Sequence, residues 1–308
     1  MRERAEVAGV TWRQLRSETG EVIGDPVQTR WLLEEASGFS GPRLLRELDN
    51  QVPPRATARL ESLVARRLSG EPLQHVLGHW GFRSLDVVVD SRVLIPRPET
   101  EVVVSAALSA LDRLCAPQPG PHARLPAAQV RPTGADLLAV DLGTGSGVIA
   151  LSLAVERDAL AVIGTDRDPA ALEVAATNLA RIPVGAAARV KFFQGDWYHA
   201  LPVDLAGRVS LIVANPPYLA EQEWTGLDPE VRGFDPFGAL VAGPSGLEAI
   251  KTIVAGARPW LTRRGTLVVE IAPDQAGRAL AMAREAGFSK ASVEPDLSGR
   301  SRVLMAEL

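Results

Sequence analysis

Residues 137–147 read LLAVDLGTGSG, a short apolar run that ends in a glycine-rich turn. A run this short, bounded by glycine, is typical of a buried strand, and Val148–Arg157 after it is predicted as a helix. The alternation continues, with strands expected at 161–166, 190–194, 211–214 and 266–271 and near 290–294 and 302–307, and helices at 169–181, 247–261 and 275–286. Such alternation predicts an α/β fold, in which a mainly parallel sheet carries helices on both faces.

The chain before residue 96 has a different pattern. At 308 residues the protein is long for one hydrophobic core, so two domains are expected. Apolar residues recur at helical spacing before residue 70, which predicts a small helical bundle at 1–75 that is a candidate for docking the substrate. Alternating apolar residues then predict a β-hairpin linker at 76–95, followed by the α/β domain at 96–308.

The composition excludes several classes of protein. The formal net charge of −4 gives no general attraction to polyphosphate, so direct nucleic-acid binding is not expected. No apolar stretch is long enough to span a membrane, and the charged N-terminus argues against secretion. Cys115 is the only cysteine, which fits a reducing cytoplasm, and the four histidines show no metal-ligand cluster. The proline-rich residues 116–134 are predicted to be an exposed linker.

Three sequence features predict a ligand of the adenosine type. The glycines of Gly143-Thr144-Gly145-Ser146-Gly147 fall as GxGxG, and glycine lets the backbone approach a bound molecule closely. Asp166 lies 23 residues after Gly143, a spacing that suits a carboxylate holding ribose hydroxyls. Asp196-Trp197 follows the next strand and offers an acceptor for the adenine amino group and an indole to lie against the purine.

The ligand that fits these features best is S-adenosyl-L-methionine. Its non-adenosine end carries an amino acid and no phosphate, and Asp141 could hold the ammonium group of that tail. NAD fits less well, because the glycine spacing differs from the GxGxxG that opens onto a pyrophosphate.

The tetrapeptide Asn215-Pro216-Pro217-Tyr218 follows another short apolar strand. Proline has no backbone N–H, so this surface is rich in acceptors and poor in donors. The Asn215 Oδ1 and the Pro216 carbonyl could each accept one hydrogen of a substrate –NH2 group, and the Tyr218 ring could lie over the planar group that carries it. This pattern predicts that Asn215, Pro216 and Tyr218 are catalytic and that all four residues bind the substrate.

Polar residues end four of the predicted strands: Asp141, Asp166, Asp196 and Asn215 all lie at or just after a strand end. In an open parallel sheet, ligands bind beyond the carboxyl ends of the strands. We therefore expect the four side chains to share one rim, with Asn215 contacting the cofactor as well as the substrate.

The chain resembles the PrmC/HemK family of peptide chain release factor N(5)-glutamine methyltransferases. Besides Asp141–Gly147, Gly195–Trp197 and Asn215–Tyr218, the resemblance includes Glu71–Gly78, the segment Val93-Leu-Ile-Pro-Arg-Pro-Glu-Thr-Glu101, and Asp296–Val303 near the C-terminus. It runs from about residue 25 to the end. Ala272, where the family usually has glycine, and the long insert at 116–134 are departures from the family pattern.

The resemblance implies a class I (Rossmann-like) methyltransferase domain with a seven-stranded, mostly parallel sheet, behind a helical N-terminal domain and a hairpin. It implies that the substrate is the glutamine of the Gly-Gly-Gln loop of class I release factors. Carried over by position, Gly143–Gly147, Asp166 and Trp197 would contact S-adenosyl-L-methionine, and Asn215–Tyr218 the glutamine. No residue is nominated as a general base.

Three other interpretations stay open. The Asn-Pro-Pro-Tyr motif also serves DNA adenine methyltransferases, in which a flipped base takes the place of the glutamine. A related family methylates a glutamine of a ribosomal protein. A catalytically silent binding module would belong to a different class, and the complete set of cofactor residues argues against it.

Overall fold

The computed structural model describes residues 9–116, 137–158 and 160–308. The chain forms two units. The first comprises the chain up to Gly78 together with Pro229–Phe234, and the second comprises His79–Asp228 and Asp235–Leu308. The predicted proline-rich linker at 116–134 lies outside the described residues, apart from its first residue.

The first unit is helical, as the sequence predicts. Its N-terminal helices are α1 (Trp12–Ile23), α2 (Pro26–Ser37), α3 (Gly41–Arg46), α4 (Pro54–Leu68) and α5 (Leu73–Leu77). The Asp25 carboxylate caps α2 by accepting hydrogen bonds from the backbone N–H groups of Val27 and Gln28. Leu32 and Leu33 are fully buried in the core of this unit.

A short helix from much later in the chain, α10 (Pro229–Phe234), belongs to the first unit. Arg67 on α4 forms an ion pair of 3.1 Å with Glu230 on this helix. The first unit is therefore not continuous in sequence, which the pattern of apolar residues did not predict.

A β-hairpin opens the second unit. Strands β1 (His79–Phe82) and β2 (Leu85–Val88) pair antiparallel, with Phe82 opposite Leu85. The turn residue Arg83 donates to both carboxylate oxygens of Glu156 and to the carbonyl of Glu101. These contacts attach the hairpin to the α/β core, and by its contacts it belongs to the second unit.

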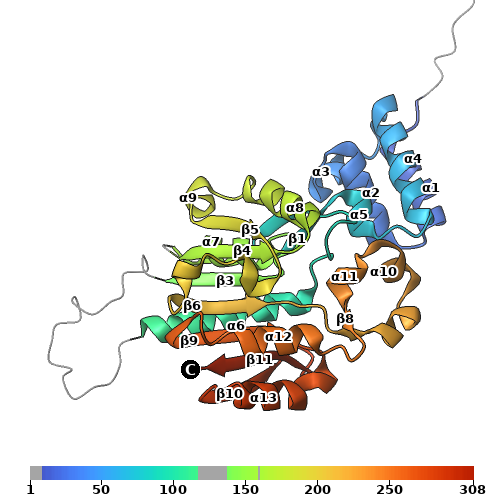
Figure 1. Ribbon diagram of the computed structural model, residues 1–308. Helices are drawn as coiled ribbons and strands as arrows, with labels where there is room; N and C mark the ends of the chain where they lie inside the picture. The colour runs from blue at the N-terminus through green and yellow to red at the C-terminus, as the bar shows by residue number, and fades with distance from the viewer. Residues whose placement is uncertain (1–8, 117–136, 159) are drawn as a thin grey trace, which may run out of the picture. The chain divides into compact units, whose positions relative to one another are not determined.

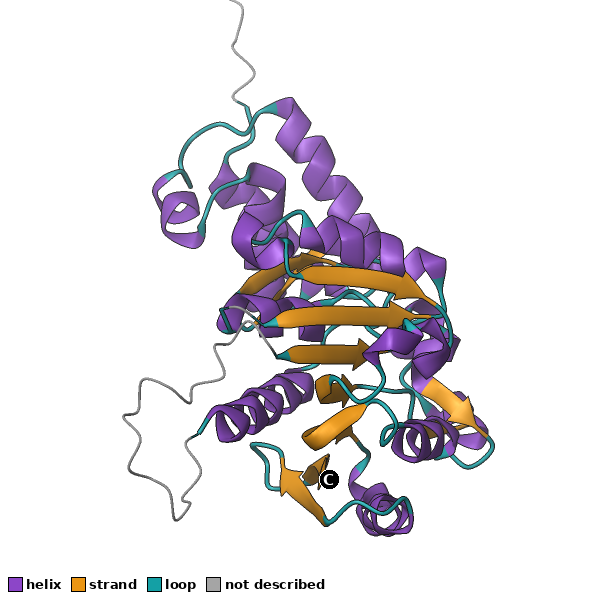
Figure 2. Cartoon of the chain, turned by 60° about the vertical axis from the view of Figure 1, so that its left-hand side comes forward, coloured by secondary structure: helices purple, strands orange, loops and turns teal. Residues whose placement is uncertain are grey.

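The second unit contains the predicted seven-stranded sheet (Figures 1 and 2). Its strands are β3 (Leu138–Leu142), β4 (Ala161–Asp166), β5 (Val190–Gln194), β6 (Val209–Ala214), β9 (Leu261–Glu270), β10 (Lys290–Pro295) and β11 (Ser301–Glu307). Their spatial order is β10-β11-β9-β6-β3-β4-β5. Neighbours from β9 to β5 run parallel, and β11 is antiparallel to both of its neighbours. The chain reverses its direction of travel across the sheet between β3 and β6, which is where such folds bind ligands.

Helices cover both faces of this sheet (Figure 1). They are α6 (Pro98–Cys115), α7 (Val148–Glu156) and α8 (Pro169–Leu179), and α12 (Glu248–Gly256) and α13 (Ala276–Glu285). Alternate residues of β6 point to opposite layers: Leu211 and Val213 pack with α6 and α7, whereas Ile212 packs with α12 and α13. Because β6 is buried on both faces, the strand is a continuous apolar run.

The short helix α9 (Val184–Ala187) lies between α8 and β5. Three further small elements follow the Asn-Pro-Pro-Tyr segment: β7 (Leu219–Ala220), α11 (Phe237–Leu240) and β8 (Val241–Gly243). Strands β7 and β8 pair with each other. Among the described residues, no helix combines the length and the apolar character needed to cross a membrane.

Candidate active site

A cavity of about 350 Å³ opens at the carboxyl ends of the parallel strands, within the second unit. This volume lies in the range of small-molecule sites. Its wall comes from several segments: Arg92–Leu94, Pro96, Arg97 and Thr100; Gly143–Ser146, Val148 and Ile149; Asp166–Asp168 and Ala171; Gly195–Trp197; Asn215 and Pro217; Pro236, Gly238, Ala239, Val241 and Ala242; and Glu248, Ala249 and Thr252. Most of the predicted cofactor residues line this cavity, whereas Asp141 and Gly147 do not; those in its wall are Gly143–Ser146, Asp166, Asp196, Trp197 and Asn215.

The glycine-rich turn adopts a backbone that favours glycine. Gly143, Gly145 and Gly147 have φ angles of 71°, 54° and 85°. A Cβ at Gly143 would lie 3.4 Å from the Trp197 ring, and one at Gly147 would lie 3.3 Å from the Ala175 Cβ. The turn thus combines positive φ angles with close contacts to neighbouring side chains. Because glycine has no side chain, a ligand can lie directly against this backbone.

Asp141 stabilises this turn from its buried side. Its Oδ2 accepts hydrogen bonds of 2.6 Å from the Thr144 hydroxyl and 3.1 Å from the Ala150 N–H. The side chain is fully buried and does not line the cavity. Burial raises the pKa of Asp141 to about 7. The Oδ2 atom of Asp141 thus holds the turn, and the predicted contact of this residue with an ammonium group stays a prediction.

Asp166 lines the cavity at the end of β4. Its Oδ2 accepts from the Gly145 N–H at 2.9 Å and its Oδ1 accepts from the Asp168 N–H at 3.0 Å. Burial raises the pKa of this carboxyl above its usual range. A carboxylate has further lone pairs, so Asp166 can still accept hydrogen bonds from ribose hydroxyls.

Trp197 and Asp196 also line the cavity. Trp197 has a positive φ of 46°, which is rare for a bulky residue and holds the indole close to Gly143. Asp196 is exposed, so its carboxylate is accessible to a ligand. Both residues line the cavity, and their contact with a purine stays a prediction.

Asn215 lies at the end of β6, partly buried in the cavity wall. Its Nδ2 donates a hydrogen bond of 2.9 Å to the Thr100 hydroxyl, which donates one of 2.8 Å to the Glu270 carboxylate. Thr100 and Glu270 are only 2% and 1% exposed. The Asn215 Oδ1 accepts no hydrogen bond from the described part of the chain and stays available as an acceptor.

The rest of the Asn-Pro-Pro-Tyr motif is divided between the cavity and the protein interior. Pro217 lines the cavity, whereas Pro216 and Tyr218 do not. The Tyr218 N–H donates to the Leu240 carbonyl, and its own carbonyl accepts from the Gln275 side chain. Burial raises the pKa of the Tyr218 hydroxyl to about 12, so the ring is neutral near pH 7.

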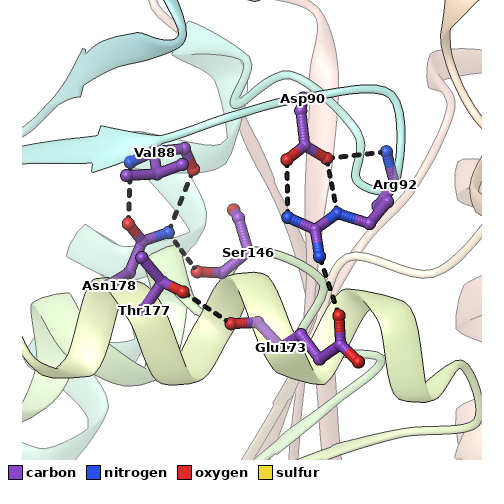
Figure 3. Close-up of polar contacts among 7 residues, drawn as sticks. All are labelled: Val88, Asp90, Arg92, Ser146, Glu173, Thr177 and Asn178. Carbon is purple, nitrogen blue, oxygen red and sulfur yellow. Dashed lines mark hydrogen bonds and ion pairs between the residues drawn. The ribbon is translucent and has the colours of Figure 1, made fainter.

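Asn178 connects the hairpin to the glycine-rich turn (Figure 3). Its Oδ1 accepts from the Val88 N–H at 2.7 Å, and its Nδ2 donates to the Val88 carbonyl at 3.1 Å and to the Ser146 carbonyl at 2.9 Å. The same view shows Arg92, a cavity residue, held by Asp90 and Glu173. Two residues of the cavity wall, Ser146 and Arg92, are thus held in place by hydrogen bonds to side chains outside the cavity.

An ion pair between Arg97 and Asp235 connects the segment before α6 to the segment that begins at Pro236. The Arg97 guanidinium lies 2.6 Å from the Asp235 carboxylate, whose side chain is 1% exposed. The segment after Asp235 also approaches Arg167, because a Cβ at Gly238 would lie 2.7 Å from its guanidinium. These contacts hold the residues from 236 to 239 at the cavity.

The sequence interpretation missed Glu270 as a site residue, and it included Thr100 only within the segment Val93–Glu101 that supports the family resemblance. Glu270 is the last residue of β9, at the same edge of the sheet as Asp141, Asp166 and Asn215. The strand-end rule that selected those three residues would have selected Glu270 as well. Among the described residues, no group of three histidine, cysteine or acidic side chains is placed to hold a metal ion.

Two family descriptions match the chain. Residues 14–78 match the PrmC N-terminal domain, and residues 128–227 match the methyltransferase small domain. The release factor glutamine methyltransferase of Cereibacter sphaeroides is 40% identical over 283 residues, which cover 91% of this chain and 90% of that protein. The release factor glutamine methyltransferase of Moorella thermoacetica is 38% identical over 293 residues, or 94% of each protein.

A solved structure shares the fold. The hMettl16 catalytic domain in complex with MAT2A 3'UTR hairpin 1 is 15% identical, with a TM-score of 0.51 over 85% of this chain and 83% of that one. At this identity the likeness concerns the fold alone.

Proposed function

The chain belongs to the family of release factor glutamine methyltransferases, and on this basis we propose that it methylates the glutamine of the Gly-Gly-Gln motif of class I peptide chain release factors. The methyl donor is S-adenosyl-L-methionine, and the acceptor is the side-chain amide nitrogen. The expected place of action is the cytoplasm, and no contact with nucleic acid is part of the proposal.

The observation that supports this function best is the orientation of Asn215. Its –NH2 group is bound to Thr100, so its Oδ1 is the atom left to face a ligand in the cavity. A hydrogen-bond acceptor at this point suits a substrate that arrives with an –NH2 group, as a glutamine side chain does.

The residues of the cavity fit the proposed methyl donor. The glycine-rich turn provides a backbone surface with no side chains in the way, Asp166 provides acceptors for hydroxyl groups, and Trp197 provides a flat apolar face. Gly143–Gly147, Asp166, Asp196 and Trp197 would hold the cofactor, with Asn215 at its reactive end. When bound, S-adenosyl-L-methionine supplies a methyl group on a positively charged sulfur, which makes that methyl group electrophilic.

The protein has to compensate for a weak nucleophile. An amide nitrogen shares its lone pair with the carbonyl group, so it attacks poorly. If the Asn215 Oδ1 and the Pro216 carbonyl each accept one hydrogen of the substrate –NH2 group, they fix the direction of the nitrogen and increase its electron density. Holding two reactants in place can lower a barrier by roughly 7–11 kcal/mol, so no strong base is required. The proton is lost to water after transfer.

Pro217 and Tyr218 complete the proposed glutamine site. Pro217 lies in the cavity wall, where it can contact the glutamine side chain. Tyr218 would reach the amide plane only from behind this wall, so its contact with the substrate is the weakest part of the proposed site.

The test is a comparison of three substrates. Purified class I release factor, ribosomal protein and DNA are each incubated with the enzyme and S-adenosyl-L-methionine, and the products are analysed by mass spectrometry. We expect one methyl group on the Gly-Gly-Gln glutamine, and none when Asn215→Ala replaces the wild-type enzyme. Methylation of the ribosomal protein or of DNA adenine, with the release factor unchanged, would refute the proposal.

A further inference from the structure

We propose that Thr100 and Glu270 act as positioning residues that set the direction of the Asn215 carboxamide, so that its oxygen faces the substrate. The inference deepens the proposed function and rests on it. Neither residue touches the reacting atoms in this proposal, since both act through Asn215.

The three side chains form a continuous chain of hydrogen bonds. The Asn215 Nδ2 lies 2.9 Å from the Thr100 Oγ1, which lies 2.8 Å from the Glu270 Oε2. Thr100 comes from the first turn of α6, and Glu270 from the end of β9. Both are buried, so water cannot replace either bond.

The number of available protons determines which atom donates in each of these hydrogen bonds. An ionised carboxylate can only accept, so the single hydroxyl proton of Thr100 goes to Glu270. The Thr100 oxygen then has only lone pairs to offer to Asn215, and it accepts from Nδ2. The Asn215 Oδ1 is therefore the atom that remains for the cavity.

Protonation of Glu270 would remove this constraint. A neutral carboxyl can donate to the Thr100 oxygen, which frees the Thr100 proton to bond the Asn215 Oδ1. The carboxamide would then turn over and present Nδ2 to the substrate. Two –NH2 groups would face each other, and neither could accept a hydrogen from the other. The ionised form of Glu270 is thus the form that supports methyl transfer.

The groups around Glu270 act in opposite directions. Arg302 on β11 and Arg97 before α6 favour the ionised carboxylate, whereas Glu99 in the first turn of α6 opposes it. Tyr218, which follows β6, interacts with Glu270 as a neutral phenol. Burial has the largest effect and raises the pKa of Glu270 to about 7. Turnover at saturating cofactor should therefore rise with pH through this range.

The first variant removes the hydroxyl and keeps the shape. In Thr100→Val, kcat for release factor should fall by about 10²-fold, the effect of a small misplacement at a reacting centre. KM for release factor and affinity for S-adenosyl-L-methionine should change by less than about twofold, because binding groups stay in place. Thr100→Ser keeps the hydroxyl and should restore most of kcat. Thr266→Val, another buried exchange in the middle of β9, the strand that ends in Glu270, is the matched control and should behave as wild type.

The second variant removes the charge. In Glu270→Gln, the rise of kcat with pH near neutrality should disappear. Burial also raises the pKa of Asp141 to about 7. Because Asp141 holds the glycine-rich turn, its protonation should change the affinity for the cofactor. For this reason kcat is measured with the cofactor saturating.

The outcomes separate this inference from the proposed function. If wild-type enzyme methylates release factor and Asn215→Ala does not, while Thr100→Val keeps wild-type kcat, the positioning role is wrong and the function stands. If Thr100→Val does not fold, the pH profile of the wild type decides, since a flat kcat between about pH 6 and 8 contradicts the role of Glu270. If the wild type leaves release factor unmethylated, the proposed function itself fails.

Discussion

Replacement of Asn178 by alanine should both destabilise the second unit and loosen the cofactor turn. The side chain is 1% exposed and makes three hydrogen bonds, two to the Val88 backbone and one to the Ser146 carbonyl (Figure 3). At about 1 kcal/mol for each bond, Asn178→Ala should cost about 3 kcal/mol of unfolding free energy. In a domain of this size, such a loss lowers Tm by about 6–12 °C.

Thr177→Ala is a matched control from the adjacent position. Its hydroxyl bonds only the Glu173 carbonyl of its own helix and is exposed to solvent, so the change should stay within about 0.5 kcal/mol. Unfolding in urea gives the two free energies, and calorimetric titration gives the affinity for S-adenosyl-L-methionine. Affinity should weaken in Asn178→Ala because Ser146 loses its anchor. Equal stability of the two variants would refute the argument that Asn178 joins the hairpin to the turn.

Three further predictions follow from single contacts. Asp166→Ala should weaken binding of S-adenosyl-L-methionine in calorimetric titration, and unchanged affinity would remove Asp166 from the cofactor site. Gly147→Ala should cost about 2–3 kcal/mol in urea unfolding, since it combines a φ of 85° with crowding against Leu151, whereas Gly185→Ala, which meets no neighbour within 4 Å, should cost little. Burial raises the pKa of Glu270 from 4.5 to about 7. Between these pH values the folded protein holds a proton that the unfolded chain releases. The free energy of unfolding should therefore fall as pH rises from 4.5 to about 7. The fall should be smaller in Glu270→Gln, and an identical pH dependence of Tm in the two proteins would contradict a raised pKa.

The sequence predicts the sheet well because its strands are short apolar runs with distinct ends. Strands β4 and β5 have the predicted bounds, and β3 begins one residue later than expected. The bounds of β6 and β9 were less accurate, since β9 begins at Leu261 rather than Thr266. Charged residues at 263 and 264 interrupt the apolar pattern there, and the pairing with β6 shifts register between Leu261 and Thr266.

The segment from 219 to 243 was not predicted. Its strands β7 and β8 are two and three residues long, too short for periodicity to register. The place of α10 in the first unit depends on contacts distant in sequence, such as the ion pair of Glu230 with Arg67. Local patterns carry no information about such contacts.

The candidate site was predicted where residue type and strand end coincide. Asp166, Trp197 and Asn215 all lie in the cavity wall. Asp141 follows the same rule, but its carboxylate faces the buried side of the turn, an orientation that residue type cannot reveal. The hydrogen bonds from Asn215 through Thr100 to Glu270 span three distant segments and emerge only from the fold.

The most direct measurement is a crystal structure of the enzyme with S-adenosylhomocysteine and a Gly-Gly-Gln peptide. The account predicts the cofactor product against Gly143–Gly147, with its sulfur near Asn215 and the peptide amide nitrogen donating to the Asn215 Oδ1. A cofactor bound away from Asn215, or a glutamine amide that makes no contact with its oxygen, would contradict it.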